Sequence, residues 1–375
     1  MSRFSFARFL AVLHKEWRQM RRDRAVIGLT VFLPLLQLFL FGYAINANPH
    51  HLATGIVSAE HSTYERTLAA ALQNTGYFDV RTVPSEAAAE QALARGDLMF
   101  VLNIPPDFSR RVDRGEKPAV LMDADATDPT AIAYASSAVV ALNASVLNRD
   151  LPANLQAQPV EPPFQIILHA RYNPEQITAL NIVPGLIGLI LTFSTLVITA
   201  LAITREREAG TMENLLAMPV RPIEVMLGKI VPYVALGYVQ VLLILTLSVV
   251  VFAVPVRGSV TLLLLALGVF IAGNLALGLT FSTIARTQMQ AQQLAQFALL
   301  PSFMLSGFMF PFQGMPAWAR AIGEVMPLTH ALRICRGVLL KGNGLAQIWP
   351  ELWPMALFAL AAAAVAVSLY RETLD

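Results

Sequence analysis

One stretch of the sequence decides the fold: Thr178–Thr204 reads TALNIVPGLIGLILTFSTLVITALAIT and contains no charged residue. As an α-helix it would rise about 40 Å, at about 1.5 Å per residue. The hydrocarbon core of a bilayer is about 30 Å thick, so the stretch is long enough to cross a membrane. A polar segment, REREAGTMENLLAMP, follows at once from Arg205 to Pro219. The pattern predicts a membrane-spanning helix that leads into a short charged loop.

Five further stretches share this length and apolar character. The chain has 375 residues, of which 55% are hydrophobic and 14% are charged, and its mean hydropathy is +0.56. Soluble domains carry about 25% charged residues, so much of this surface is expected to face lipid. The sequence predicts an α-helical integral membrane protein with six transmembrane helices. The other five predicted spans are residues 25–45, 225–254, 259–284, 290–310 and 352–370.

Basic residues flank the first predicted span unevenly. Five Lys and Arg residues lie at positions 15–24, whereas residues 46–65 contain none. Basic residues in short loops mark the cytoplasmic side, so we expect a multi-pass membrane protein with both termini in the cytoplasm. The loop between the fifth and sixth spans disagrees, because four basic residues fall on its predicted outer side: Arg320, Arg333, Arg336 and Lys341.

Residues 1–24 carry apolar side chains at three- and four-residue spacing, from Phe6 to Met20, with basic side chains on the other faces. This periodicity predicts an amphipathic helix. Such a helix can lie in the membrane interface and connect to the first span at residues 25–45. An ordinary helix packed on protein is the alternative interpretation.

Residues 46–177 differ in texture, because short apolar runs alternate with helical patterns. Strands are expected at 55–59, 78–83, 98–103 and 119–123, and helices at 64–75, 85–95, 106–114 and 130–148. The alternation predicts an α/β domain, inserted between the first two spans on the extracytoplasmic side. Prolines at 159, 162 and 163 predict a stiff linker back to the membrane.

Two features of the chain resemble reactive sites. Asp123, Asp125 and Asp128 cluster, but the Gly and Glu of a calcium-binding loop do not follow them, so no metal site is expected. Cys335 is the single cysteine. We expect it to be a buried small hydrophobe rather than a reactive thiol.

The loop after Thr204 predicts a short helix at 211–218. Gly210 is expected to break the preceding helix, Thr211 to cap the new one, and Glu213 to suit its dipole. Pro219 would end it. The predicted helix has an apolar tip. Because exposure of such a tip to water is unfavourable, it predicts a protein partner. This tip consists of Met212, Leu215 and Leu216.

The sequence also argues against several function classes. Gly228 and Lys229 are followed by Ile230 rather than Ser or Thr, so they do not form a phosphate-binding loop. The predicted spans contain no acidic residue. A proton-coupled antiporter or a cation channel would be expected to use such residues.

Two motifs resemble those of ABC-2 type transporter permeases. The cytoplasmic motif is Arg205-Glu206-Arg207-Glu208-x-Gly210-Thr211-x-Glu213-x-Leu215-Leu216-x-x-Pro219, followed by Gly228-Lys229. The second is Leu305-Ser306-Gly307-Phe308-x-Phe310-Pro311, followed by Met326-Pro327-Leu328-Thr329. It is similar to the family's fifth span and extracytoplasmic re-entrant hairpin, which here would cover 311–342. The large domain after the first span resembles the bacterial efflux subgroup that includes sodium and multidrug exporters, which implies the bacterial inner membrane.

The resemblance implies the membrane subunit of a type V-like ABC exporter. Two permease chains, identical or paralogous, would pair with two copies of an ATP-binding cassette subunit, which would bind ATP and Mg. This chain would need no cofactor or metal of its own and no nucleic acid partner, and recruitment of a periplasmic membrane-fusion adaptor stays open. The helix 211–218 would be the coupling helix. The coupling residues would be Glu206, Glu208, Gly210, Thr211, Met212, Glu213, Leu215, Leu216 and Pro219.

Spans two and five face the dimer axis in that family, so the substrate path is predicted to follow their polar and aromatic residues. The mixture of hydroxyl, amide and ring suits a drug-like, amphipathic or lipid-like substrate leaving the cytoplasm or inner leaflet. Hydrogen bonding between helices is the alternative role. Span four repeats small residues from Gly268 and is predicted to be scaffold. The predicted path residues are Thr192, Thr195, Thr199, Gln293 and Phe297.

Other functions remain as alternatives. The same architecture could extrude sodium or another cation. A membrane sensor with an extracytoplasmic ligand domain would need an output domain, for which the loops have no room. A membrane enzyme acting on lipids would need converging groups, whereas His169, Glu324 and His330 are scattered in the sequence. We therefore expect a transporter permease rather than an enzyme.

Overall fold

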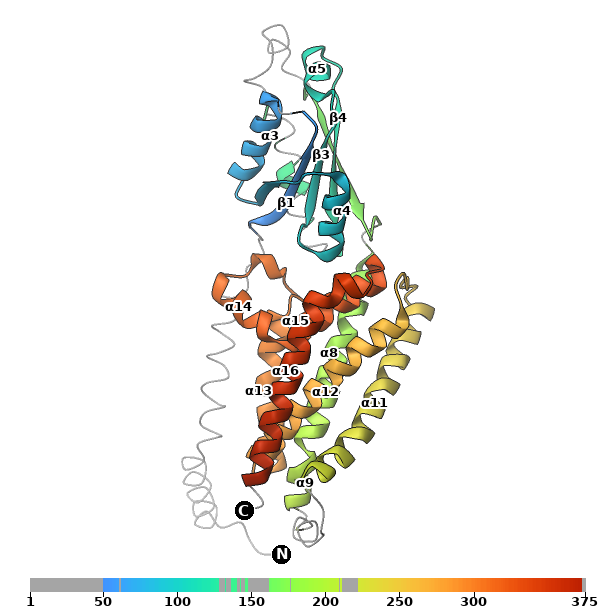
Figure 1. Cartoon of the computed structure of the whole chain (residues 1–375), viewed down its shortest axis with the longest axis vertical. Coiled ribbons are helices and arrows are strands. Elements are labelled where there is room, and N and C mark those ends of the chain that lie inside the picture. Colours follow the sequence, from blue (N-terminus) through green and yellow to red (C-terminus); the bar gives the residue numbers. More distant parts are fainter. Residues whose placement is uncertain are drawn as a thin grey trace, which may run out of the picture.

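The computed structural model describes residues 50–127 except 61, single positions and short runs between 132 and 147, and residues 162–372 except 176, 209 and 211–221. An α/β domain sits at one end of a helical bundle, and the two together form an elongated molecule (Figure 1). The predicted interfacial helix 1–24, the first span and the coupling helix 211–218 lie outside the described residues.

The α/β domain is built on a five-stranded sheet with the order β2-β1-β3-β4-β5. Strand β3 runs antiparallel to β4, and the other neighbours are parallel. The strands expected near 55, 78, 98 and 119 are present as β1 to β4, but β5 was not predicted, because its stretch was assigned to the linker. The strands are β1 (Leu52–Ser58), β2 (Phe78–Thr82), β3 (Phe100–Ile104), β4 (Ala119–Asp125) and β5 (Gln165–Arg171).

Helices cover both faces of this sheet. Helices α3 (Thr63–Asn74) and α5 (Phe108–Asp113) pack in one core cluster, and α4 (Glu86–Arg95) packs in another on the opposite face. Serine caps fix where two of them begin: the hydroxyl of Ser62 accepts a hydrogen bond from the amide of Glu65, and that of Ser85 from Ala88. The alternating inward and outward residues of the strands supply both cores.

Four helices of the described bundle are long and apolar enough to cross a membrane, over 182–200, 232–250, 260–284 and 345–369. They correspond to four of the predicted spans. The fifth predicted span, 290–310, is a shorter helix that ends at Leu305, and the glutamines of its first turns make it more polar than the others. The bundle helices are α8 (Thr178–Ala200), α9 (Ala202–Glu208), α11 (Pro222–Val250), α12 (Val260–Ile284), α13 (Gln288–Leu305) and α16 (Leu345–Glu372).

Between α13 and α16 the chain folds into short helices at the end of the bundle nearest the α/β domain (Figure 1). After α13 the chain turns at Gly307, whose φ of 81° suits a residue without a Cβ. Helix α15 then inserts its apolar side chains against α8 and α12. This segment occupies the predicted hairpin 311–342. Its elements are η2 (Phe312–Gly314), α14 (Ala317–Val325), α15 (Pro327–Arg336) and η3 (Gly337–Lys341).

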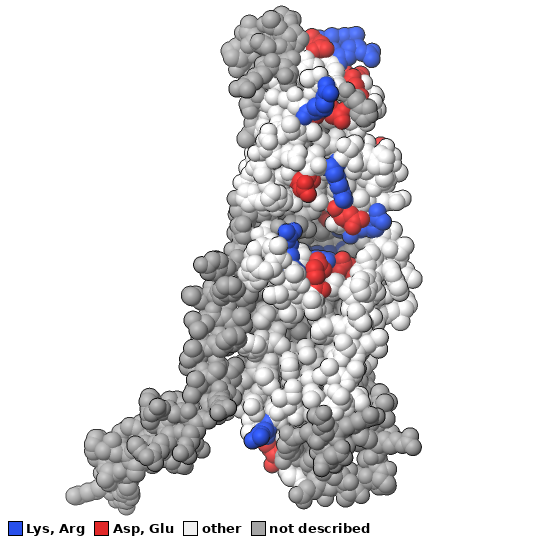
Figure 2. Space-filling model, turned by 60° about the vertical axis from the view of Figure 1, so that its left-hand side comes forward, with Lys and Arg blue, Asp and Glu red and all other residues white. Residues whose placement is uncertain are grey.

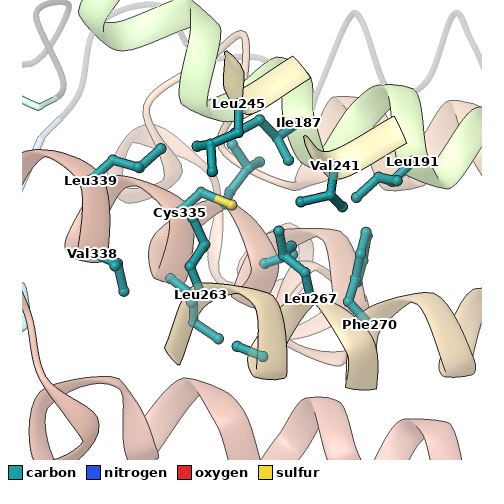
Figure 3. Close-up of a cluster of buried hydrophobic side chains, with 14 of the residues drawn as sticks. Ile187, Leu191, Val241, Leu245, Leu263, Leu267, Phe270, Cys335, Val338 and Leu339 are labelled. Atoms are coloured by element: carbon teal, nitrogen blue, oxygen red, sulfur yellow. The ribbon is translucent and has the colours of Figure 1, made fainter. Parts of the chain in front are cut away.

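Figure 3 shows the core that joins these helices. Side chains from α8, α11, α12, α15 and η3 converge, and Cys335 lies fully buried among them, as predicted for a small hydrophobe. Close packing lets such an interior hold together where lipid removes most of the hydrophobic driving force between helices. The labelled members are Ile187, Leu191, Val241, Leu245, Leu263, Leu267, Phe270, Cys335, Val338 and Leu339.

Helix α12 is the scaffold that its small residues predicted. A methyl group at Gly278 would overlap the hydroxyl of Thr199 and the carbonyl oxygen of Leu196 on α8. A methyl group at Gly268 would overlap the hydroxyl of Tyr238 on α11, and one at Gly273 would touch α16. The three glycines therefore let three neighbouring helices approach the same central helix closely.

Candidate transport groove and coupling end

Helices α8 and α13 enclose an open groove of about 570 Å³. Ile190 and Phe193 on α8 are 40% and 52% exposed, although both are large and apolar. A single amide, that of Gln296, interrupts the described apolar lining. The remaining lining side chains are Leu189, Leu299, Leu300 and Phe303. The groove can therefore take an apolar or amphipathic molecule, or the matching face of another membrane protein.

The three predicted path threonines of α8 do not line this groove. Thr192, Thr195 and Thr199 are 3%, 4% and 0% exposed. Each hydroxyl donates to a carbonyl one turn earlier on the same helix, over 2.8, 2.5 and 2.5 Å respectively. The groove is lined by a different stripe of α8, and the part of these threonines in a substrate path stays a prediction. Their hydroxyls satisfy α8 internally, and at Thr199 the side chain also seats against α12.

The two predicted residues of α13 lie closer to the groove. Gln293 and Phe297 are half-buried and stand about one turn before Gln296 and Leu300 on the same helix. They adjoin the groove toward the α9 end without lining it. The predicted path residues and the groove thus lie on the same two helices, α8 and α13, but other side chains line the groove. The predicted path itself is not tested by this geometry. Because the spans are apolar on all sides, their hydropathy carries no signal for which stripe faces the groove.

A polar contact behind the groove ties α8 to α11. The hydroxyl of Ser194 donates a 2.7 Å hydrogen bond to the side-chain oxygen of Gln240. Hydrogen bonds of this kind stabilise helix pairs within membranes. Ser194 therefore has the structural role that the sequence offered as the alternative for such residues.

At the opposite end of the bundle from the α/β domain, Glu208 links α9 to α13. Its carboxylate accepts hydrogen bonds from the amide and the side chain of Gln288, over 2.8 and 2.5 Å. Gln288 is the first residue of α13, and a carboxylate is favourable at a helix N-terminus. Glu208 was predicted to serve the ATPase contact, but in this protomer its described partner is within the chain.

Gly210 follows with a φ of 68°, which confirms the predicted break after the second span. The other predicted coupling residues lie outside the described part of the chain. For Glu206 this is true of the side chain, and it is true of the whole residue for Thr211, Met212, Glu213, Leu215, Leu216 and Pro219. Their role stays a prediction. The structure adds that the loop leaves from a helix end that is anchored to α13.

The described residues contain no group of three or more metal-binding side chains. Asp123 is bound by His169 at 2.8 Å and by Arg171 at 3.0 Å, and Asp125 by Lys341 at 2.5 Å. Of the three carboxylates that the sequence grouped as an acidic cluster, Asp123 and Asp125 therefore have basic partners, and Asp128 lies outside the described residues.

An α-helical membrane protein with an open groove between two helices of its bundle has the form of a transport permease. The chain matches the family model described as "ABC-2 family transporter protein" over residues 24–368, so it belongs to that family. It is 32% identical to "Probable multidrug ABC transporter permease YbhS" of Escherichia coli (strain K12), over 90% of each chain. It is also 27% identical to "Inner membrane transport permease YhhJ" of the same strain, over 96% of each chain.

A more distant relative extends the comparison beyond bacteria. "ABC transporter G family member 20" of Dictyostelium discoideum is 25% identical over 94% of this chain, which corresponds to 48% of that protein. The family match and the bacterial relatives show that this chain is a membrane permease subunit of an ABC transporter.

Proposed function

We propose that the chain is the permease half of an ABC exporter that moves an amphipathic, drug-like substrate along the α8–α13 groove. The observation that carries this proposal is the groove itself, with exposed Phe193 and Ile190 opposite Gln296. An apolar lining with one amide suits a molecule with a large apolar body and a small polar part. It offers no carboxylate to hold sodium, which favours the organic substrate over cation extrusion.

Two copies of the permease, identical or paralogous, would meet along this face, so that their grooves join at the dimer axis. Two ATPase subunits would bind ATP and Mg and press on the loop helices 211–218, while this chain supplies no ATP site. The α/β domain, inserted after the first of six spans, would lie outside the cytoplasm of a bacterial cell, with both termini inside. The α/β domain and the segment 311–342 lie at one end of the bundle and α9 at the other, which supports this arrangement.

Substitution of the groove tests the proposal directly. Phe193→Ala removes a ring from the opening, and Leu243→Ala removes a side chain of similar exposure, 57%, from α11. The permease and its ATPase, reconstituted in vesicles with the cassette sites outward, would be assayed for ATP-dependent uptake of ethidium, rhodamine 6G and doxorubicin. We expect Phe193→Ala to lower uptake of at least one dye about tenfold and Leu243→Ala to leave it unchanged.

The Thr195→Ala variant tests the buried stripe of α8 that does not line the groove. Its hydroxyl bonds only to its own helix among the described contacts, so uptake should remain near that of the wild type. Equal uptake by Phe193→Ala and wild type, or loss of uptake in Thr195→Ala alone, would move the path away from the groove. If the wild-type complex accumulates none of the three dyes, the drug-like substrate class is wrong.

A further inference from the structure

A second cavity, of about 580 Å³, lies where the α/β domain meets the bundle. The domain contributes the end of α4, the residue before β3 and the end of β4, and the bundle contributes α14, α15, η3 and the start of α16. Figure 2 shows it as a hollow ringed by acidic and basic side chains, above a broad uncharged surface. Nothing in the proposed transport along α8 and α13 uses this cavity.

The carboxylates that line the cavity all have cationic partners. Asp125 lies 2.5 Å from the ammonium of Lys341, and Glu324 lies 2.7 Å from the guanidinium of Arg333. Glu351 is bound by Arg333 and by His330, and Asp97 by Arg95. The negative charge of the lining is therefore neutralised within the protein.

Two basic residues of the lining take no part in these ion pairs. Arg320 on α14 and Arg336 at the end of α15 have no carboxylate within salt-bridge distance among the described residues. The Nε atom of Arg336 is buried and has no hydrogen-bond partner in the described structure. A buried donor without an acceptor is costly and calls for an explanation. Since the guanidinium of Arg336 is permanently charged and the residue lines the cavity, an anionic ligand there would neutralise its charge.

The rest of the lining indicates the shape of the ligand. Met99, Phe312 and Leu332 supply apolar wall beside the two arginines. The volume is many times what a bare phosphate needs and falls in the range of sites for drug-sized molecules. The cavity also lies next to the end of α13 and the start of α16, where the head groups of a surrounding bilayer are expected.

We propose that this cavity binds the phosphate head group of an amphipathic molecule, held by Arg320 and Arg336. Guanidinium groups bind phosphate oxygens through paired hydrogen bonds and neutralise their negative charge. A bilayer phospholipid and a soluble phosphate ester share this chemistry. Because the two walls come from different parts of the chain, a bound head group would bridge the α/β domain and the bundle.

Binding can be measured on the purified full-length chain in a neutral detergent, by titration calorimetry. The probes are dihexanoyl phosphatidylglycerol below its micelle concentration, dihexanoyl phosphatidylcholine, and inorganic phosphate. The variants are Arg336→Gln, Arg320→Gln and Arg336→Lys, with Arg110→Gln as the matched control, because Arg110 is exposed on α5 away from the cavity. Thermal unfolding of each variant checks that it is folded.

We expect the anionic lipid to bind the wild type and the control equally, and each Gln variant to bind at least tenfold more weakly. Arg336→Lys should lie between them, because it keeps the charge and loses the paired hydrogen bonds. Competition by inorganic phosphate at millimolar concentration would assign the site to soluble phosphate esters, and lack of competition would assign it to lipid. Arg320→Gln is on an exposed side chain and keeps the test valid if Arg336→Gln does not fold. Binding that is unchanged in both Gln variants, or the absence of binding by all three probes, overturns the proposal.

Discussion

The groove between α8 and α13 and the cavity beneath the α/β domain have nearly the same volume, about 570 and 580 Å³, but opposite chemistry. The described lining of the groove consists of apolar side chains and a single amide. The described lining of the cavity includes nine charged groups, which are Arg95, Asp97, Asp125, Arg320, Glu324, Arg333, Arg336, Lys341 and Glu351. The groove opens along helices whose neighbours are lipid or another membrane chain, where unpaired charge is expensive. The cavity lies at the ends of these helices, where charge can be solvated or paired.

The comparison also explains two of the four basic residues that conflicted with the predicted orientation. Arg333 and Lys341 lie on the same side as the α/β domain, where the positive-inside rule would not place them. Both are held by carboxylates, Arg333 by Glu324 and Glu351, and Lys341 by Asp125. Basic residues that are used for packing between parts of a protein carry less weight as signals of orientation.

The largest effect is expected at the joint that closes the cavity. Lys341 and Asp125 are 7% and 8% exposed, and the Lys341 ammonium also donates to the carbonyl of Leu93. Lys341→Met would leave the Asp125 carboxylate buried without its cation. Loss of one partner of a buried pair costs about 3–5 kcal/mol. We expect a clear fall in the thermal midpoint of the purified chain.

The double variant Lys341→Met with Asp125→Asn should recover part of this loss, because the amide is neutral and can still accept from Thr127. Arg95→Met is the matched control, since its pair with Asp97 is 46% and 54% exposed and should contribute at most about 1 kcal/mol. If Lys341→Met is no more damaging than Arg95→Met, the buried joint does not hold the domain in place.

The next effect concerns the rigid backing of the groove. Gly278→Ala would push a methyl group into Thr199 and Leu196 of α8, and overpacking of this kind costs about 1–3 kcal/mol. The better helix propensity of Ala offsets part of it, by up to about 1 kcal/mol. Gly273→Ala is the control, because its methyl group would lie 3.3 Å from the Cβ of Ala359, a far smaller overlap. The thermal midpoint of Gly278→Ala should be lower than that of Gly273→Ala. The reverse order would show that α8 and α12 are not closely packed at Gly278.

Much of this architecture could be read from the sequence. Long apolar stretches determined the four described spans, the small residues of α12 indicated close packing, and Gly210 marked the end of α9. Strand β5 was missed, because its sequence QIILHAR follows a proline-rich stretch and lacks a regular alternation of apolar and polar residues. Its place is set by pairing with β4, which is a tertiary effect.

The two sites depended more strongly on tertiary structure. The threonines of α8 looked like path residues because they are polar, but a hydroxyl can bond to the preceding turn and leave no polar surface. The cavity depends on pairs such as Asp125 with Lys341, which are 216 positions apart in the chain. Local sequence patterns do not specify such pairs.

A smaller effect, dependent on pH, is expected at His330 beside the cavity. Two causes lower the pKa of His330: burial, which is the largest, and the charge of Arg333. The hydrogen bond from the ring to Glu351, the charge of Glu351 and the carbonyl of Glu324 raise it. The net result is a pKa above the ordinary value of 6.5. The two ring nitrogens lie 2.6 and 2.8 Å from a carboxylate and a carbonyl oxygen, so both donate and the ring is charged.

Because the folded chain holds this proton more tightly than the unfolded chain, its stabilising effect is complete below about pH 6.5. The effect is lost as the pH rises through the higher pKa of the folded state. The thermal midpoint should therefore fall over this range in the wild type and fall less in His330→Gln. Parallel pH profiles for the two proteins would show that His330 does not titrate between the folded and unfolded states.

The smallest effect is expected at the other end of the groove, at Glu208. Glu208→Gln keeps an acceptor for the amide of Gln288 but removes the negative charge from the start of α13. An exposed charged contact contributes about 0–1 kcal/mol, so ATP-dependent dye uptake should fall less than about fivefold. Leu215→Asp, in the apolar tip of the proposed coupling helix, should instead abolish uptake while insertion and dimer formation persist. If Glu208→Gln abolishes uptake in a folded complex, its carboxylate meets the ATPase directly, as the sequence motif first predicted, and the contact with α13 is secondary. If the Leu215→Asp variant transports normally with the ATPase bound, coupling does not pass through this loop. The segment 205–219 would then keep only one of the roles given to it here, the link between α9 and α13 through Glu208.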